Sequence, residues 1–270
     1  MKTSLRVNIL ASFTTLIVLS TLLLLTNFYF QSSEAARALS EKIGAEMSDK
    51  VIGQIQAYLT PAINGTMLTA KRIQREEIGR IDEEGLWRSM WDMLMNAPQL
   101  ESLYVATADG RFWQSRRKPE WTTRFLRVGS AETLERWFLR DEDYRLKSIE
   151  DKKTTYDPRQ RPWYLSTTAA MKVNWSDIYI FKTVKRPGLT ATFPVVRDGK
   201  LTAVVAADIS LASISEFLAR QSVSEHGFIL IVDERNEVVA FGDQEKTVQA
   251  TADGKGLRTS RVSDLGLGWL

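Results

Sequence analysis

Residues 189–210 read LTATFPVVRDGKLTAVVAADIS, two apolar, β-branched runs on either side of Asp198-Gly199. An Asp-Gly pair between two such runs is a typical hairpin turn, so the runs are predicted to pair as antiparallel strands. The second run ends in Asp208, whose carboxyl group directly follows a buried-looking stretch. An ionisable side chain in that position is a candidate for a functional site.

Working outward, the same signals predict more strands. The run LESLYVATADGRFWQSR (100–116) forms a hairpin around Ala108-Asp109-Gly110, and IYIFKTV (178–184) precedes a turn at 185–188 and pairs with 189–196. An antiparallel sheet is the natural assembly of these runs. Helical periodicity is expected at 84–95, and the charged stretch AETLERWFLRDEDY (131–144) is interpreted as a helix over a sheet face or a flexible flap.

The N-terminal part of the chain contains an uncharged run at residues 9–30, ILASFTTLIVLSTLLLLTNFYF. About 20 apolar residues suffice for a helix to cross a bilayer, so this run is predicted to be a transmembrane helix. Lys2 and Arg6 precede it and Glu34 follows it, which places residues 1–8 in the cytoplasm and the rest of the chain outside. The alternative is a cleaved signal peptide, whose apolar core is usually shorter.

A long outer helix is predicted over residues 31–80. Apolar side chains recur there at four-residue intervals, at Ala35, Leu39, Ile43, Met47, Val51, Ile55 and Leu59. Pro61 and Asn64-Gly65 are candidate points for a kink. The apolar stripe suits a helix that forms a homodimer contact and carries motion to the membrane, and equally a helix that packs on its own domain.

Composition excludes several functions. The net charge is +3 and is spread along the chain, so no nucleic-acid-binding surface is indicated. The chain has no cysteine and only one histidine, His226, so neither a zinc or redox-metal site nor a cofactor is expected. A Ser–His or Cys–His catalytic set has no motif here, and the chain is predicted not to be an enzyme.

The stretch YDPRQRPWY (156–164) supplies the second half of the candidate site. Arg161 can donate two N–H groups to a carboxylate, and Trp163 adds a donor with an aromatic wall. Asp208 can bind an ammonium at the other end of the same small molecule, so the three residues together suit a zwitterion. The structural alternatives are an ion-pair role for Arg161, a core role for Trp163 and a helix-capping role for Asp208.

The C-terminal part repeats the earlier organisation. LASISEFLAR (211–220) is predicted to be an amphipathic linking helix, and GFILIVDERNEVVAFG (227–242) a second hairpin. Residues 219–270 are too few for a second domain of ordinary size. We therefore expect the sequence to stop inside a second outer domain, ahead of a second membrane span and an intracellular output module.

Together these features resemble the double Cache sensor regions of bacterial transmembrane receptors. The resemblance rests on the apolar span, the long helix, YDPRQRPWY, WSDIYIF (175–181), GLTATFPVV (188–196) and VVAADISL (204–211). It implies an α+β fold: two PAS-like antiparallel-sheet Cache modules after the helix, a membrane-distal ligand-binding module at 81–218 and an incomplete membrane-proximal one at 219–270. It also implies a sensor region held outside the bacterial inner membrane, similar to those linked to nucleotide cyclases, HD-type phosphodiesterases or chemoreceptors.

In a subset of that family a spaced set of residues binds an amino acid. This sequence fills the set with Tyr156, Arg161, Trp163, Tyr164, Tyr179 and Asp208. The resemblance implies that the arginine and tryptophan meet the ligand's carboxylate, that the aspartate meets its ammonium and that the tyrosines complete the cage. The alternatives are another small organic ligand, such as an amine, organic acid or nucleobase, and an ectodomain that mainly dimerises.

Overall fold

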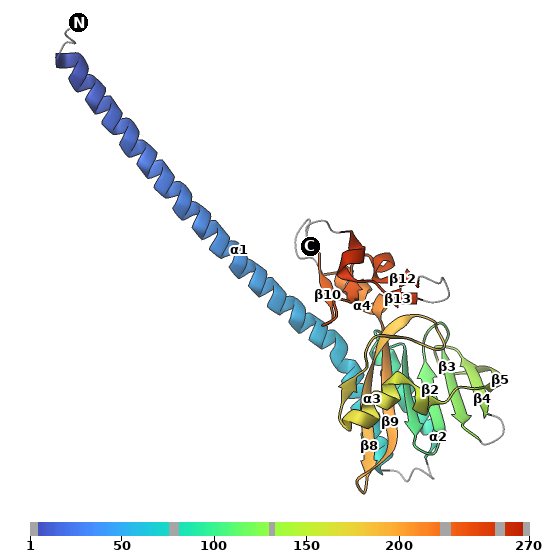
Figure 1. Cartoon of the computed structure of the whole chain (residues 1–270). Coiled ribbons are helices and arrows are strands. Elements are labelled where there is room, and N and C mark those ends of the chain that lie inside the picture. The colour runs from blue at the N-terminus through green and yellow to red at the C-terminus, as the bar shows by residue number, and fades with distance from the viewer. Residues whose placement is uncertain (1–4, 76–80, 130–132, 222–227, 252–256, 267–270) are drawn as a thin grey trace. The chain divides into compact units, whose positions relative to one another are not determined.

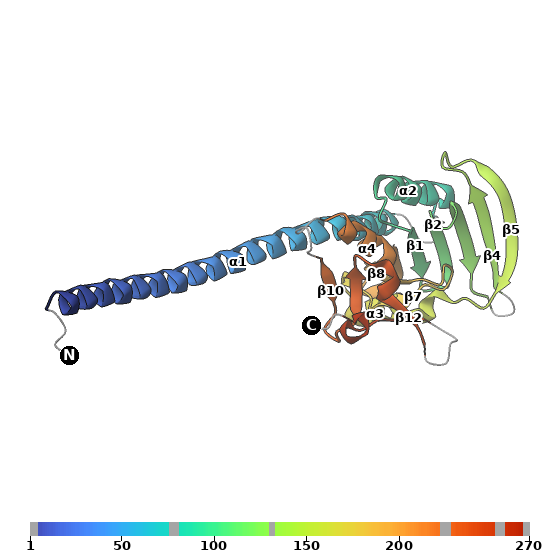
Figure 2. The same cartoon turned by 90° about the horizontal axis from the view of Figure 1, so that it is seen from above.

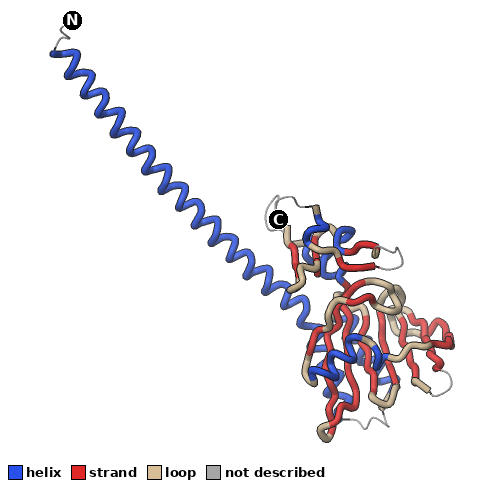
Figure 3. Tube along the Cα trace, viewed as in Figure 1, coloured by secondary structure: helices blue, strands red, loops and turns tan. Residues whose placement is uncertain are grey.

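The computed structural model describes residues 5–75, 81–129, 133–221, 228–251 and 257–266. The chain divides into two compact units, Met1–Ile55 and Gln56–Leu270. The described part of the first unit is helical, whereas strands predominate in the second (Figure 3).

Helix α1 spans Leu5–Arg75 and contains the whole apolar run 9–30. Hydroxyl side chains in that run donate to backbone carbonyls one turn earlier, as Thr14 Oγ1 does to Leu10 O at 2.6 Å, which satisfies them without water. Within the part of the chain that the structure describes, this is the one helix long and apolar enough to cross a membrane. The expected long helix is confirmed as far as Arg75 and continues through Pro61, while residues 76–80 lie outside the described residues.

The second unit is built on a nine-stranded antiparallel sheet (Figure 1). Its strand order is β5-β4-β3-β2-β1-β9-β8-β6, with β7 pairing with β8. The strands are β1 (Ser102–Thr107), β2 (Arg111–Arg116), β3 (Thr122–Arg127), β4 (Thr133–Arg140), β5 (Leu146–Thr154), β6 (Asn174–Trp175), β7 (Tyr179–Ile180), β8 (Pro187–Arg197) and β9 (Lys200–Ser210). The predicted hairpins β1–β2 and β8–β9 are therefore confirmed. Asp198 and Gly199 join β8 to β9 with φ values of 50° and 72°, the left-handed geometry that a tight hairpin turn needs.

Two helices cover opposite faces of this sheet. Ser115 Oγ of β2 donates to Trp87 O of α2 (Glu83–Asn96) at 3.0 Å. Phe112 of β2 instead packs in a core cluster with Trp163 of α3 (Pro162–Ala170). Odd and even residues of a strand point to opposite sides, so α2 and α3 lie on different faces, as the view in Figure 2 shows. The candidate site lies on the α3 face.

A small C-terminal group of elements follows β9. Helix α4 (Leu211–Ala219) begins with Ser210 as its N-cap, whose Oγ accepts from Ser213 N at 3.2 Å. The elements after it are β10 (Leu230–Val232), β11 (Val238–Phe241), the 3-10 turn η3 (Gln244–Thr247), β12 (Val248–Ala250), β13 (Leu257–Thr259) and η4 (Val262–Leu265). The predicted α4 helix and the β10–β11 hairpin are confirmed. Val238 and Phe241 of β11 form a small core cluster with Leu265 of η4.

The interpretation of 131–144 as a helix or flap is wrong. Residues Thr133–Arg140 form strand β4, which pairs with β3 and with β5, a strand that the sequence analysis did not predict. Arg136 and Asp151 face each other across this pair, with Nε and Oδ1 2.7 Å apart. Helix-favouring residues such as Leu134 and Glu135 take the strand conformation because pairing on both sides outweighs their local propensity.

Gly188, in β8, gives a test of this packing. A Cβ at that position would lie 2.7 Å from the backbone oxygen of Ile209 and would overlap the Phe181 ring. Gly188→Ala is expected to lower the free energy of unfolding by about 1–3 kcal/mol, because the backbone of β9 must shift. Thermal unfolding of the detergent-solubilised chain, followed by tryptophan fluorescence, measures the loss.

Gly65→Ala is the matched control. Gly65 lies inside α1, and a Cβ there would meet only Met93 Sδ of α2, at an ordinary contact distance of 3.7 Å. That change is expected to stabilise the chain by about 1 kcal/mol through helix propensity. Equal effects of the two substitutions would contradict the close approach of β8 and β9 at Gly188.

Candidate functional site

The motif YDPRQRPWY forms a rigid corner between β5 and α3. Asp157 caps the 3-10 turn η2 (Pro158–Gln160), accepting from Arg159 N at 2.9 Å and from Arg159 Nε at 3.0 Å. Pro162 then occupies the first turn of α3, where its missing N–H costs nothing. Arg161 is left between the two helices in extended backbone, with φ of −86° and ψ of 149°. The motif thus fixes the position from which the Arg161 side chain extends.

A cavity of about 40 Å³ lies on the α3 face of the sheet. Five of the six predicted residues line it: Tyr156, Arg161, Trp163, Tyr179 and Asp208. The sixth, Tyr164, is buried in the core beside Trp163, with ring centroids 5.6 Å apart, and is not among the lining residues. Residues from β1, β2 and β3 and the stretch 181–184 after β7 complete the wall.

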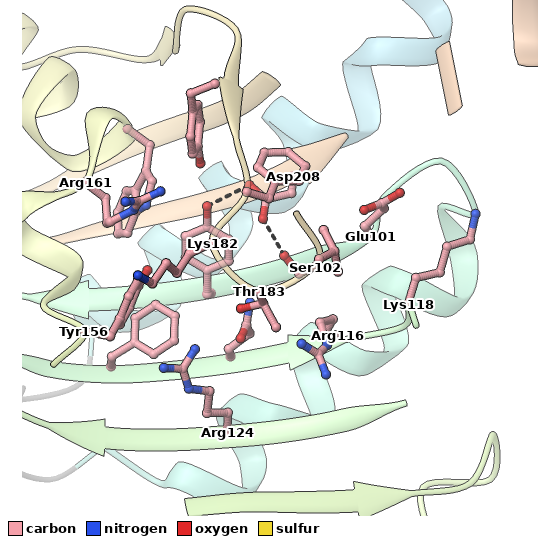
Figure 4. A pocket seen from close by; sticks show the side chains of 17 residues that line it. Glu101, Ser102, Arg116, Lys118, Arg124, Tyr156, Arg161, Lys182, Thr183 and Asp208 are labelled. Carbon is pink, nitrogen blue, oxygen red and sulfur yellow. Dashed lines mark hydrogen bonds between the residues drawn. The ribbon is translucent and has the colours of Figure 1, made fainter. Parts of the chain in front are cut away.

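Asp208 is held at the end of β9 by three hydroxyl groups. Tyr104 OH donates to Oδ1 at 2.7 Å, and Ser102 Oγ donates to Oδ2 at 2.8 Å (Figure 4). Thr190 Oγ1 also donates to Oδ1, at 2.7 Å. Tyr179 OH lies 2.7 Å from Thr190 Oγ1 and donates to it, because the single threonine proton is used on Asp208. A carboxylate has about four acceptor positions, so three donors leave one for a ligand.

Burial raises the pKa of Asp208 to about 6, against the three hydrogen bonds, which lower it. The same loss of solvent, with the nearby Asp208 charge, raises the pKa values of Tyr104 and Tyr179 well above their usual range. The two phenols therefore remain protonated donors at neutral pH. The site is a carboxylate in a desolvated, hydroxyl-lined environment, where an ammonium ion is attracted more strongly than in water.

Arg161 faces the same cavity from the other side. Its Nη2 lies 3.4 Å from Ile180 O, and its guanidinium carbon is 5.8 Å from the centre of the Tyr179 ring. Within the described ranges it forms no ion pair with a carboxylate, so the alternative of a structural ion-pair role receives no support. The capping role considered for Asp208 is filled by Ser210.

Aromatic rings form the floor and one wall. Trp163 is 1% exposed and packs edge-on against Tyr104, with ring centroids 5.0 Å apart. Tyr156 packs against Phe112 at 5.7 Å, and burial raises its pKa to about 12. Trp163 is thus both a core residue and part of the cavity wall, which combines the two interpretations considered from the sequence.

The sequence analysis missed several cavity residues. Ser102, Tyr104, Gln114, Arg116 and Arg124 all line the cavity from β1, β2 and β3. The alternation within the two predicted strands carries the missing signal, because residues 102, 104, 112, 114 and 116 share one face. Which of the two faces holds the site could not be read from that alternation.

Among the described residues, no group of three or more His, Cys, Asp or Glu side chains could hold a metal ion. His226, to which no role was given, lies outside the described residues.

The buried charge of Asp208 predicts a pH effect on stability. The folded state binds this proton more tightly than the unfolded state, so the contribution of Asp208 to stability falls as pH rises from about 4 to about 6. Asp208→Asn does not titrate and can keep the network, with its amide donating to Ser102 Oγ. The stability of the variant relative to the original should therefore rise over that range, by on the order of 3 kcal/mol, and level off above it.

Denaturant unfolding at half-unit pH intervals measures this difference. Asp143→Asn, at an exposed loop position, controls for the loss of one carboxylate. A difference between Asp208→Asn and the original chain that does not change with pH would contradict the raised pKa.

Comparisons with known proteins agree with this architecture. Residues 130–216 match the family model described as methyl-accepting chemotaxis protein-like, first PDC sensor domain. The chain is 24% identical over 113 residues to the methyl-accepting chemotaxis protein PctB of Pseudomonas aeruginosa, which covers 42% of this chain and 18% of that protein. It is 25% identical over 108 residues to PscA of Pseudomonas syringae pv. tomato, covering 40% and 17%. The matched part spans less than a fifth of the length of these relatives.

Solved structures are similar in fold, among them the following two. The ligand-binding domain of the amino acid chemoreceptor PctB, in complex with L-Gln, has a TM-score of 0.52 at 18% identity and covers 74% of this chain and 68% of its own. The ligand-binding domain of the amino acid chemoreceptor PctC of Pseudomonas aeruginosa, in complex with GABA, has a TM-score of 0.51 at 18% identity. The match covers 74% of this chain and 75% of that one. The predicted α+β fold and the resemblance to receptor sensors are confirmed: residues 130–216 match a PDC sensor domain model, and the chain has the fold of chemoreceptor ligand-binding domains.

Proposed function

We propose that this chain is the extracytoplasmic ligand-binding region of a transmembrane signalling receptor, and that it binds an amino acid or a related small amine-bearing acid. The observation that carries the proposal is the pair of opposite charges, Arg161 and Asp208, that line one aromatic cavity. Neither has a charged protein partner among the described residues. The two free charges suit the two ends of one zwitterion.

Each predicted residue has a role in the proposed complex. Arg161 and the Trp163 indole bind the ligand's carboxylate, and Asp208 binds its ammonium at the one acceptor position left open. Tyr156 and Tyr179 enclose the ligand from two sides. Tyr164 supports the Trp163 ring from the core, 5.6 Å away, and is proposed to act through it.

The size of the cavity limits the ligand. A single water needs about 10–15 Å³ measured in the same way, so about 40 Å³ admits a small molecule of a few heavy atoms. A larger ligand requires the exposed side chains at the mouth, Lys182 and Thr183, to move outward. Lys185 and Arg186, two basic residues that follow this stretch, are exposed and do not line the cavity.

A sensor is favoured over an enzyme by the kind of chemistry present. The matched family model describes a sensor domain. The cavity holds donors, acceptors and aromatic walls, and the chain has neither a cysteine nor a second histidine with which to build a nucleophile and base. Another small organic ligand, such as an amine, organic acid or nucleobase, remains the alternative for the same cavity.

The membrane assignment is part of the proposal. Residues 9–30 anchor the receptor in the bacterial inner membrane, and the sheet unit lies on the periplasmic or extracellular side. Large apolar side chains on the helix beyond the span are exposed, at Leu39, Ile43, Met47 and Ile52. This exposure supports a homodimer formed through the long helix, because an isolated helix leaves such a stripe in water.

Calorimetric titration tests the ligand. In Arg161→Ala the ligand's carboxylate loses a bidentate partner, and amino-acid affinity should fall by about 2–5 kcal/mol. Asp208→Asn should weaken an amino acid by about 1–3 kcal/mol but weaken its deaminated analogue much less, since only the first carries an ammonium. Lys172→Ala, an exposed position outside the cavity, is the control. If Asp208→Asn binds the amino acid as tightly as the original chain, the zwitterion assignment fails.

A reporter fusion tests the membrane topology. Alkaline phosphatase joined after residue 40 should be active, because it is exported, while a fluorescent protein at the N-terminus should remain in the cytoplasm. Recovery of the chain as a shortened, soluble periplasmic species would identify residues 9–30 as a cleaved signal and contradict the anchor.

A further inference from the structure

Two buried polar side chains of the cavity have no use in the contacts proposed above. Gln114 and Arg116 are 6% and 8% exposed, and both line the cavity from β2. The Oε1 atom of Gln114 and the Nε and Nη1 atoms of Arg116 have no hydrogen-bond partner among the described residues. A buried donor or acceptor without a partner destabilises the fold, so such groups in one cavity point to a ligand.

The sheet register places Arg116 beyond Asp208. Ser102 of β1 lies directly opposite Asp208 of β9 on one side and Arg116 of β2 on the other. Two strand spacings therefore separate the backbones of Asp208 and Arg116, about 10 Å. In Figure 4, Asp208 lies between Arg161 and Tyr156 on one side and Arg116 on the other. Lys182 and Thr183, the exposed side chains at the mouth, must move outward to admit a ligand of this length. A ligand held at Asp208 and Arg161 can then extend its remaining substituent toward Arg116.

The charges around Arg116 leave its guanidinium available. Burial, followed by the nearby charge of Arg124, lowers the pKa of Arg116 to about 10, so it is still a cation at neutral pH. Of the acidic neighbours, Glu135 is ion-paired with Arg124, Glu120 is exposed, and Glu101 lines the cavity without an ion pair to Arg116. The Trp137 ring centre lies 4.7 Å from the Arg116 guanidinium carbon, so the indole forms a cation–π contact with the guanidinium. This contact leaves the N–H groups of Nε and Nη1 without a hydrogen-bond partner among the described residues.

We propose that Arg116 binds a second carboxylate at the far end of the ligand, which makes the ligand an acidic amino acid of the glutamate or aspartate type. This inference rests on the proposed function, because it assigns the far end of the same ligand. The second carboxylate neutralises the buried guanidinium and accepts its N–H groups. A neutral carboxamide would supply an acceptor but leave the cation uncompensated, and a basic side chain would face Glu101 but be repelled by Arg116.

Titration of the full chain in detergent with L-glutamate, L-aspartate, L-glutamine, L-alanine and L-lysine tests the assignment. The original chain should bind glutamate or aspartate at least about 10-fold more tightly than the other three. Arg116→Gln should weaken the preferred acid by about 10- to 100-fold and change alanine by less than about threefold. Arg116→Lys keeps the charge and should retain part of the preference.

Stability separates a ligand contact from a structural role. If Arg116 serves the ligand, Arg116→Gln should leave the melting temperature of the unliganded chain unchanged or raise it, because a buried, uncompensated cation is removed. Arg136→Gln is the matched control: it removes an arginine of the same sheet that is exposed, paired with Asp151 and outside the cavity. It should change no affinity.

Four results would overturn the inference. The first is an original chain that binds glutamine, lysine or alanine as tightly as either acid. The other three concern Arg116→Gln: an unchanged affinity for the acids, an equal loss of affinity for the acids and alanine, or a lowered melting temperature without a selective loss of affinity for the acids. Binding of alanine with no preference for an acid would reject the second carboxylate and keep the amino-acid sensor. Failure of all five compounds to bind would reject this inference and, with it, the assignment of an α-amino acid as the ligand.

Discussion

The hydrogen bonding of the buried Asp208 carboxylate joins three strands of the sheet at one point. Ser102 and Tyr104 come from β1, Thr190 comes from β8, and all three donate to a carboxylate at the end of β9. The register of β8, β9 and β1 must be correct for these distances to exist, since a slip of one residue would turn each side chain to the other face. The register of the central strands therefore determines both the arrangement of the sheet and the chemistry of the cavity.

The α3 face of the sheet carries more charge than a core normally holds. Arg124 is paired with Glu135, and its guanidinium also lies 4.9 Å from the centre of the Tyr156 ring. Arg116 has a ring contact but unpaired N–H donors. A fold selected for stability alone would have apolar residues here, because burying ions costs more than their pairing returns. The retention of these groups is understandable where a ligand supplies the missing partners.

The cavity is connected to the long helix through a short path within the sheet unit. Asp208 is followed after one residue by Ser210, the N-cap of α4, and Phe217 of that helix stacks on Tyr58 of α1 with ring centroids 4.3 Å apart. Tyr58 OH also donates to Ser213 O at 3.0 Å. A ligand that favoured one position of the end of β9 would act on elements in direct contact with α1. Coupling through this path requires that the ligand bind two states of the chain with different affinity.

The sequence by itself determined the apolar helix, the two hairpins with their Asp-Gly turns, and the residues of the YDPRQRPWY corner, because each depends on neighbours in the chain. The helix depends on the length of the apolar run, the hairpins on the chemistry of their turns, and the corner on capping by Asp157 and the fixed geometry of Pro162. Only the tertiary structure decided that 133–140 is a strand, that Tyr164 lies behind the cavity wall, and that Ser102, Gln114 and Arg116 share a face with Asp208. These features depend on which strands become neighbours. Pairing between distant segments fixes both the conformation of β4 and the side of the sheet on which each side chain is buried, and no local pattern encodes that choice.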